Sequence, residues 1–180
     1  PRPASFSSLF DENLNGLKIG VLEQGFGHPL SDPVVDACVK QAAERFAELG
    51  VEVSTVSIPI HLDGLAIWGA IVSDGFWQTM KLRGLGYNYD GNYSTGLFRA
   101  MENWREHLPQ MPINAQVLML LGAHLEQFEG RYYGLAKNHV QRLKADYDEA
   151  LSKVDVLLMP TTVQRASKNP EPDDLPGVFA

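Results

Sequence analysis

His61 and Asp63 are the first pair of residues in this chain whose types and spacing could do chemistry. They lie two positions apart after a strand-like stretch and could supply two metal ligands from one loop. A zinc site needs three or four ligands, and no third ligand follows at a set spacing. The simpler interpretation is a turn at the end of a strand, in which Asp63 caps the next helix.

The remaining histidines and the single cysteine are the other reactive groups. His124 and His139 fall on successive predicted helices, where a pair could bind a metal or act as acid and base. The simpler interpretation is that each is solvated or hydrogen-bonded to a neighbour. Cys38 lies on a predicted helix beside Val35 and Val39, so we expect a buried small hydrophobe rather than a nucleophile.

Established catalytic motifs are absent from the sequence. It contains no Gly-x-Ser-x-Gly elbow, no His-Glu-x-x-His pair, no paired cysteines for zinc and no phosphate-binding P-loop. Gly84 and Gly86 form part of a glycine motif, but its third glycine and a preceding strand are missing. Motifs alone therefore assign no catalytic residue and no cofactor.

Aromatic side chains crowd the middle of the chain, at Trp68, Trp77, Tyr87, Tyr89, Tyr93 and Trp104. One interpretation is core packing together with a loop that stacks on itself. The other is an apolar wall of a small-molecule pocket, since such sites are lined by aromatic groups. The Gly, Asn and Tyr residues of the segment 84–93 would suit a lid over a cleft.

Two strands and a helix are predicted to open the regular part of the chain. Alternating apolar residues indicate a strand at 17–22, and a second strand is expected at 51–58. The helix between them is expected to begin after Ser31 as N-cap and to end before Gly50. Such a strand–helix–strand unit predicts parallel strands with a right-handed crossover.

Three helices and one more strand are predicted to follow. The helices are expected at about 65–82, 114–128 and 130–153. The apolar run 154–160 is typical of a strand buried on both faces of a sheet. The fold class is therefore α/β, but with too little sheet for so much helix, which suggests partner strands in another part of a parent protein.

Composition narrows the classes of partner. Hydrophobic residues make up 44% and charged residues 21%, and the net charge is −7. An acidic chain without a basic run is not expected to bind nucleic acid. No apolar stretch reaches the length of a membrane span, and residues 1–3 do not resemble a signal peptide. With one cysteine no internal disulfide can form, so we expect a cytoplasmic protein.

Several stretches of the chain resemble consecutive segments of the amidase signature family. They lie at 16–22, 31–36, 48–53, 130–138 and 154–162, and they occur in the family's order. The resemblance implies part of the amidase signature fold, a mixed β-sheet covered by helices. It also implies that residues 1–180 are a single segment of a larger amidase domain, with 1–15 and 163–180 as coil.

The family's activity implies a function for the parent protein. Amidase signature enzymes hydrolyse an amide to an acid and ammonia or an amine, with a Ser–cis-Ser–Lys triad and no cofactor or metal. The triad lies upstream of the segment that this chain resembles. Ser7 and Ser8 lack the flanking glycines of the nucleophile loop, so no catalytic residue is assigned here and the chain alone is expected to be inactive.

Substrate-binding residues are implied by the resemblance at four positions. Trp68, Trp77 and Trp104 are candidates for the wall of the acyl pocket, and Thr161 for the mouth of the site. The expected partners are a small amide substrate and a second copy or partner chain that completes the sheet. The alternative functions are a stand-alone α/β module that binds a small molecule, and a protein-interaction domain.

Overall fold

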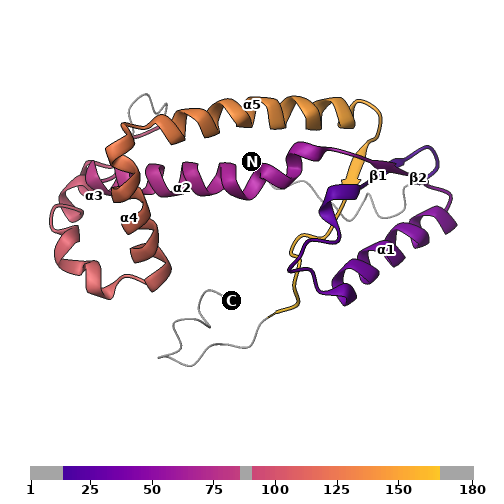
Figure 1. Cartoon of the computed structure of the whole chain (residues 1–180), viewed down its shortest axis with the longest axis horizontal. Coiled ribbons are helices and arrows are strands. Elements are labelled where there is room, and N and C mark those ends of the chain that lie inside the picture. The colour runs from indigo at the N-terminus through magenta and orange to yellow at the C-terminus, as the bar shows by residue number, and fades with distance from the viewer. Residues whose placement is uncertain (1–13, 86–90, 167–180) are drawn as a thin grey trace. The chain divides into compact units, whose positions relative to one another are not determined.

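A computed structural model describes residues 14–85 and 91–166 of the chain. The chain divides into two compact units, one of Pro1–His61 with Ala145–Ser167 and one of Leu62–Lys144 with Lys168–Ala180. The first holds the sheet and the second holds most of the helices, as the labels in Figure 1 show.

Three parallel strands form the sheet of the first unit (Figure 1). They are β1 (Lys18–Leu22), β2 (Glu52–Val56) and β3 (Val156–Leu158), and their order is β2-β1-β3. Ile19 of β1 is in register with Val53 on one side and Val156 on the other. The predicted parallel strand–helix–strand unit and the later strand are therefore confirmed.

The helix α1 (Pro33–Glu48) connects β1 to β2, but its N-cap is not the predicted residue. The Asp32 carboxyl group accepts a hydrogen bond from the Val34 amide at 2.9 Å and so caps the helix. The prediction of Ser31 was wrong by one position, and the Ser31 hydroxyl is buried with no hydrogen-bond partner among the described residues. Gly50 follows the helix with a φ of 87°, as predicted from its position.

Gly20 allows the side chains on one face of the sheet to close over β1. A Cβ atom at this position would lie 2.6 Å from Val56 Cγ2 and 3.0 Å from Val154 Cγ2. The core of the unit centres on Leu22, the last residue of β1, together with Ile58 and Ala150. A side chain at position 20 would therefore overpack the most buried part of the sheet.

β3 does not have the burial that its apolar sequence predicted. Among the described residues it pairs with β1 alone, and 44% of the Val156 surface is exposed. The prediction of burial on both faces is wrong for the described chain. The reason is that an apolar run indicates a strand that is suited to burial. Whether such a strand is buried depends on the elements that pack against it.

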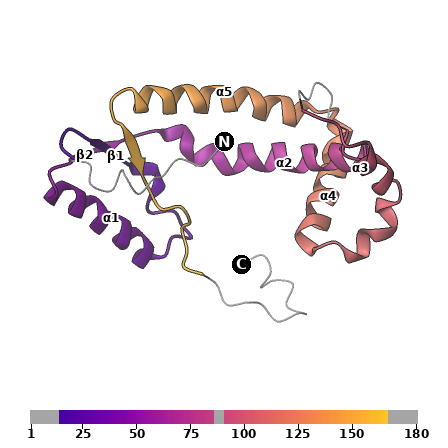
Figure 2. The ribbon, with the colours of Figure 1, turned by 180° about the vertical axis from the view of Figure 1, so that it is seen from behind.

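Helices make up the second unit (Figure 2). They are α2 (Gly64–Lys81), α3 (Thr95–Ala100), α4 (Ile113–Leu125) and the first part of α5 (Arg131–Leu151). The predicted helices that correspond to α2, α4 and α5 are confirmed. α3 and the 3₁₀ helix η4 (Trp104–Gln110) were not predicted, because segments this short carry too few residues to show a helical period.

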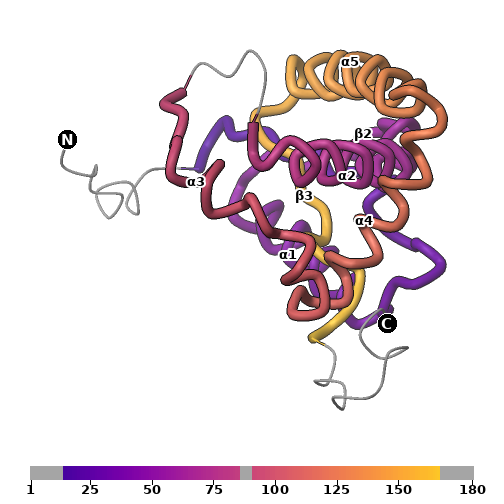
Figure 3. Tube along the Cα trace, turned by 90° about the vertical axis from the view of Figure 1, so that its left-hand side faces the viewer, coloured from indigo at the N-terminus to yellow at the C-terminus, as the bar shows by residue number. Residues whose placement is uncertain are grey.

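α2 and α4 pack closely, as the end-on view in Figure 3 shows. Gly122 of α4 makes this possible, because a Cβ atom there would lie 2.3 Å from the Ser73 carbonyl oxygen. Met80 of α2 and Met119 of α4 are buried in the cluster beside this crossing, together with Trp104. The position of α4 against α2 thus depends on a glycine.

Several predictions fall partly outside the described residues. Residues 1–13, 86–90 and 167–180 are not described, so most of the predicted terminal coil and most of the predicted Tyr loop lie outside. Tyr93 is described, and its ring lies 6.3 Å from that of Phe98, centroid to centroid. None of the helices in the described ranges is both long and apolar enough to cross a membrane.

Candidate functional site

A cavity of about 630 Å³ opens on α2 and is the first candidate for a functional site. This volume lies within the range of small-molecule pockets. Residues of α2, of the segment after it and of the start of α5 line the cavity: Asp74, Gly75, Gln78, Thr79, Leu82, Leu85, Glu129, Gly130 and Tyr133. The lining therefore combines two acids, an amide, two hydroxyl groups and a few apolar side chains.

Asp74 is the buried acid of this cavity, with 4% of its surface exposed. Its Oδ1 accepts a hydrogen bond from Gln78 Nε2, one helical turn later, at 3.4 Å, which is long for such a bond. In the described part of the chain no Lys, Arg or His forms an ion pair with Asp74. Sequence reasoning missed this residue, although an isolated acid inside an apolar helix is a signal that could have found it.

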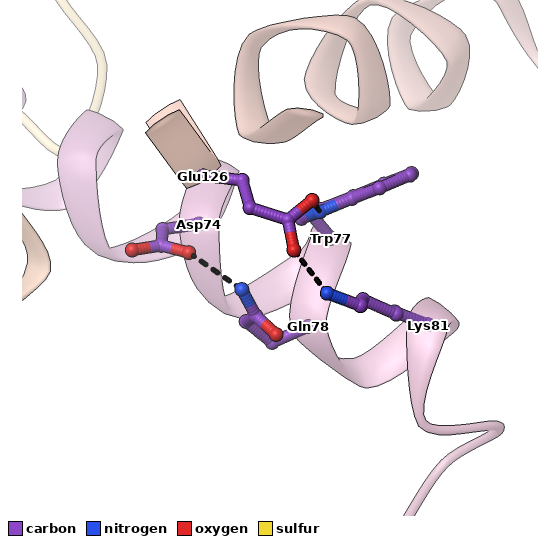
Figure 4. A network of polar contacts seen from close by, with 5 residues as sticks. All are labelled: Asp74, Trp77, Gln78, Lys81 and Glu126. Carbon is purple, nitrogen blue, oxygen red and sulfur yellow. Dashed lines mark hydrogen bonds and ion pairs between the residues drawn. The ribbon is translucent and has the colours of Figure 1, made fainter. Parts of the chain in front are cut away.

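Glu126 ties the far end of α2 to the 3₁₀ helix η5 (Glu126–Phe128) (Figure 4). Its Oε2 accepts a hydrogen bond from Trp77 Nε1 at 2.9 Å, and its Oε1 forms an ion pair with Lys81 Nζ. The hydrogen bond from Lys81, and then that from Trp77, lower the pKa of the Glu126 carboxyl group. No local sequence pattern joins these residues, so this network could not have been predicted.

Two of the three predicted wall tryptophans lie together. The rings of Trp77 and Trp104 meet edge to face at 87°, with their centroids 6.4 Å apart. Trp104 is 5% exposed and packs with Met80 and Met119, while the Arg105 guanidinium lies 4.5 Å from the centroid of its ring. Trp104 is therefore a core residue of this unit, and Trp77 connects that core to Glu126.

Trp68 and Thr161 are the other two predicted substrate-binding residues. Trp68 is on α2 with 57% of its surface exposed, and it makes no ring contact with another described aromatic residue. Thr161 belongs to the other unit, where it is exposed three residues after the end of β3. Their substrate-binding roles stay predictions.

The loops after the three strands meet at the carboxyl edge of the sheet, which is the second candidate site. Gln24 joins two of these loops, because its Nε2 donates to Ser57 Oγ at 2.8 Å and its Oε1 accepts from the Ile58 amide at 2.7 Å. The chain runs from β1 to β2 on one side of β1, and it later returns as β3 on the other side of β1. In open parallel sheets, ligands bind at the carboxyl ends of strands where the order reverses in this way.

Asp32 holds the segment after β3 against the start of α1. Its amide donates to the Val163 carbonyl at 2.8 Å, and its carboxylate pairs with Arg165. The hydrogen bond from the Val34 amide, followed by that from Arg165, lowers the pKa of the Asp32 carboxyl group. A cavity of about 460 Å³ lies here, lined in part by Ser31 and Gln164, and Thr161 is on the segment that leads to it.

His61 contacts Tyr147 rather than a metal-binding group. Its Nδ1 lies 2.6 Å from the Tyr147 hydroxyl oxygen, and burial lowers the pKa of His61 and raises that of Tyr147. Asp63 stands at the N-cap of α2, as predicted, but its side chain makes no capping hydrogen bond. No group of three or more His, Cys, Asp or Glu residues within 14–85 and 91–166 is placed to hold a metal ion.

The other reactive residues of the sequence are mostly solvated. His124 lies beside the Gln127 amide, with 2.9 Å between its Nδ1 and Gln127 Nε2, and His139 is exposed. Cys38 is exposed, so the prediction of a buried cysteine is wrong. The reason is that Cys38 lies on an exposed part of α1, whereas the buried residue of this helix is Ala43.

Comparison with known proteins places the chain in a family. A family model described as Amidase matches residues 1–178. The chain is 34% identical to an enantioselective amidase of Rhodococcus rhodochrous over 88% of this chain and 31% of that protein. It is 30% identical to the A subunit of glutamyl-tRNA(Gln) amidotransferase from Prochlorococcus marinus over 89% of this chain and 33% of that protein.

A solved structure agrees with these sequence matches. The crystal structure of the A subunit of glutamyl-tRNA(Gln) amidotransferase from Thermotoga maritima superposes with a TM-score of 0.58 and 22% identity, over 91% of this chain and 30% of that chain. The likeness shows the fold. The chain spans about a third of the length of the curated relatives described above. The family match over nearly the whole sequence, with the matching fold, shows that the chain belongs to the amidase signature family.

Proposed function

We propose that this chain is part of an enzyme that hydrolyses a linear carboxylic amide to an acid and ammonia or an amine. The observation that carries the proposal is the match of the Amidase family model to residues 1–178. The 34% identity to an enantioselective amidase supports it. No residue of the Ser–cis-Ser–Lys triad can be assigned in this sequence. The proposed substrate class therefore rests on the family and not on catalytic residues of this chain.

The chain's proposed contribution is scaffold for a larger amidase domain, of which residues 1–180 are one segment. Two observations support this role. The chain spans about a third of its relatives' length, and β3 has one strand neighbour in the described residues while Val156 is 44% exposed. An apolar strand with a free edge is a site for further strand pairing. The rest of the parent protein, a second copy or a partner chain would supply those strands.

The second proposed contribution is a wall of the substrate pocket. The indole rings of Trp68 and Trp77 on α2 are proposed to contact the substrate. The buried Trp104 packs edge to face against Trp77 and so holds its ring in place. Thr161 is proposed at the mouth of the site, because it is exposed at the carboxyl edge of the sheet, where α/β folds bind ligands. A cytoplasmic location is proposed as well, supported by the lack of any disulfide partner for Cys38.

Hydrolysis assays test the proposal directly. The purified 180-residue chain is expected to release no ammonia from aliphatic or aromatic amides, whereas the parent enzyme is expected to release it. In the parent enzyme, Trp68→Ala and Thr161→Ala are expected to raise KM by about tenfold, the effect of losing a substrate contact of about 1.4 kcal/mol. Hydrolysis by the isolated chain would contradict the scaffold role.

Sedimentation velocity with ANS fluorescence separates the scaffold role from a stand-alone module. A scaffold segment with uncovered apolar surface is expected to self-associate with rising concentration and to bind ANS. A compact monomer that ignores ANS would close its own core, and it would favour an independent α/β binding domain instead.

A further inference from the structure

We propose that the cavity on α2 binds a cationic group, a protonated primary amine or a guanidinium, that pairs with Asp74. The proposal concerns a site that amide hydrolysis does not require, and it stands whether or not the parent enzyme cleaves amides. Three observations carry it: the burial of Asp74, the lack of a partner for its charge, and the polar lining of the cavity.

A buried carboxylate such as that of Asp74 is energetically unfavourable when no positively charged group pairs with it. The residue is 4% exposed on an apolar helix, and a carboxyl group in such surroundings is stabilised only by hydrogen bonds or a positive charge. Its one side-chain hydrogen bond in the described chain is the 3.4 Å contact with Gln78. No Lys, Arg or His of the described residues forms an ion pair with this carboxyl group, and it lines an open cavity that a donor can enter.

Lys81 is the cation nearest in sequence on α2, and it is already engaged. Its ammonium group pairs with Glu126, and the Trp77 indole holds the second oxygen of the same carboxylate (Figure 4). Figure 4 also shows that Lys81 points toward Glu126, while an oxygen of Asp74 faces Gln78. The helix therefore keeps its own lysine away from Asp74 and leaves that acid for another cation.

The cavity lining fits an ammonium or guanidinium group in charge and in shape. Glu129 adds a second carboxyl group, and no Lys or Arg is among the lining residues. Thr79 and Tyr133 contribute hydroxyl groups that can accept further N–H bonds. The volume of about 630 Å³ exceeds what a metal ion needs and suits an organic cation.

Calorimetric titration of the 180-residue chain tests the site with benzylamine as the probe. Benzylammonium is expected to bind with a saturable isotherm, and the uncharged benzyl alcohol is expected not to bind. Asp74→Asn keeps the shape of the side chain and removes its charge, so it is expected to weaken binding by about tenfold or more. The matched control Asp63→Asn, an exposed acid at the N-cap of the same helix, is expected to leave binding unchanged.

Two further arms keep the test decisive. Glu129 is exposed, so Glu129→Gln is expected to fold and to weaken benzylamine binding about two- to threefold, which tests the site even if Asp74→Asn unfolds. Nα-acetyl-lysine amide and Nα-acetyl-arginine amide present the same charges as protein side chains do. Tighter binding of these amides than of benzylamine would identify a neighbouring polypeptide as the source of the cation.

The proposal has clear contrary outcomes. Absence of saturable binding for benzylamine and both amino-acid amides at millimolar concentrations would overturn it. Equal binding of benzylamine and benzyl alcohol would show that the cavity selects apolar surface and not charge. Equal binding by the wild-type chain, the Asp74→Asn variant and the Glu129→Gln variant would place the ligand elsewhere.

Discussion

Gly122 lies so close to Ser73 that a Cβ atom on Gly122 would be 2.3 Å from the Ser73 carbonyl oxygen. The same atom would be 2.4 Å from the Cβ of Trp77. Real carbon atoms do not approach to these distances, so α4 can rest on α2 only with glycine at this position. The contact links the backbone of one helix to the segment of the other that carries Asp74 and Trp77.

Gly122→Ala is therefore expected to destabilise the chain by about 1–3 kcal/mol, the usual cost of overpacking. Urea denaturation followed by far-UV circular dichroism measures the free energy of unfolding. Gly69→Ala is the matched control, since nothing lies within 4 Å of a Cβ at this position of α2. The control is expected to gain up to about 1 kcal/mol from better helix propensity. A neutral Gly122→Ala would contradict the close packing of α2 and α4.

Truncation of Trp104 is expected to destabilise the chain far more than truncation of Trp68. Trp104 is 5% exposed, so Trp104→Ala is expected to cost about 3–5 kcal/mol of unfolding free energy by opening a cavity. Trp68 is 57% exposed, so Trp68→Ala is expected to change stability by less than about 0.5 kcal/mol. Chemical denaturation of both variants distinguishes the core residue from the surface residue. A large loss of stability in Trp68→Ala would mean that its indole is buried in solution.

His61 is expected to make the stability of the first unit depend on pH. Burial lowers its pKa below the ordinary value of 6.5, so the folded state favours the neutral ring. Its contribution is fully present above pH 6.5 and is lost as the pH falls from 6.5 through the lower folded-state pKa, because the unfolded chain binds the proton first. Thermal unfolding between about pH 5 and pH 8 measures the effect.

The variant His61→Asn is expected to flatten this pH dependence. His139→Asn serves as the control, because His139 is exposed and its loss should leave the wild-type profile intact. Tyr147→Phe removes the hydroxyl group 2.6 Å from His61 Nδ1 and is expected to lower stability at pH 8, where the hydrogen bond is intact. Identical profiles for wild type and His61→Asn would show that His61 does not titrate with unfolding.

Asp32 is expected to act through both its cap and its ion pair. Asp32→Ala removes the acceptor for the Val34 amide and the partner of Arg165, so it is expected to lower the melting temperature clearly. Asp32→Asn keeps a cap acceptor and loses only the charge, so it is expected to lower the melting temperature less. Raising the salt concentration should reduce the difference between wild type and Asp32→Asn. Equal effects of the two substitutions would assign the whole stabilisation to the charge of Asp32.

Periodicity in the sequence was sufficient to predict most regular elements. Apolar residues at helical spacing predicted α1, α2 and α5, and alternation predicted the strand that becomes β1. Local backbone chemistry predicted Gly50, since a residue with positive φ after a helix favours glycine. The family was also within reach, because its similarity is spread along the chain in order.

Tertiary structure alone decided the candidate site and the burial. The pairing of Glu126 with Lys81, the meeting of Trp77 with Trp104 and the demand for glycine at position 122 join residues far apart in sequence, and no local pattern encodes them. The prediction of burial was wrong for the same reason. The apolar sequence of β3 predicted a strand covered on both faces, but Val156 is exposed among the described residues. Sequence determines what a segment is able to form, because that depends on the segment itself. Contacts and exposure depend on what other segments bring to it, and only the folded chain decides that.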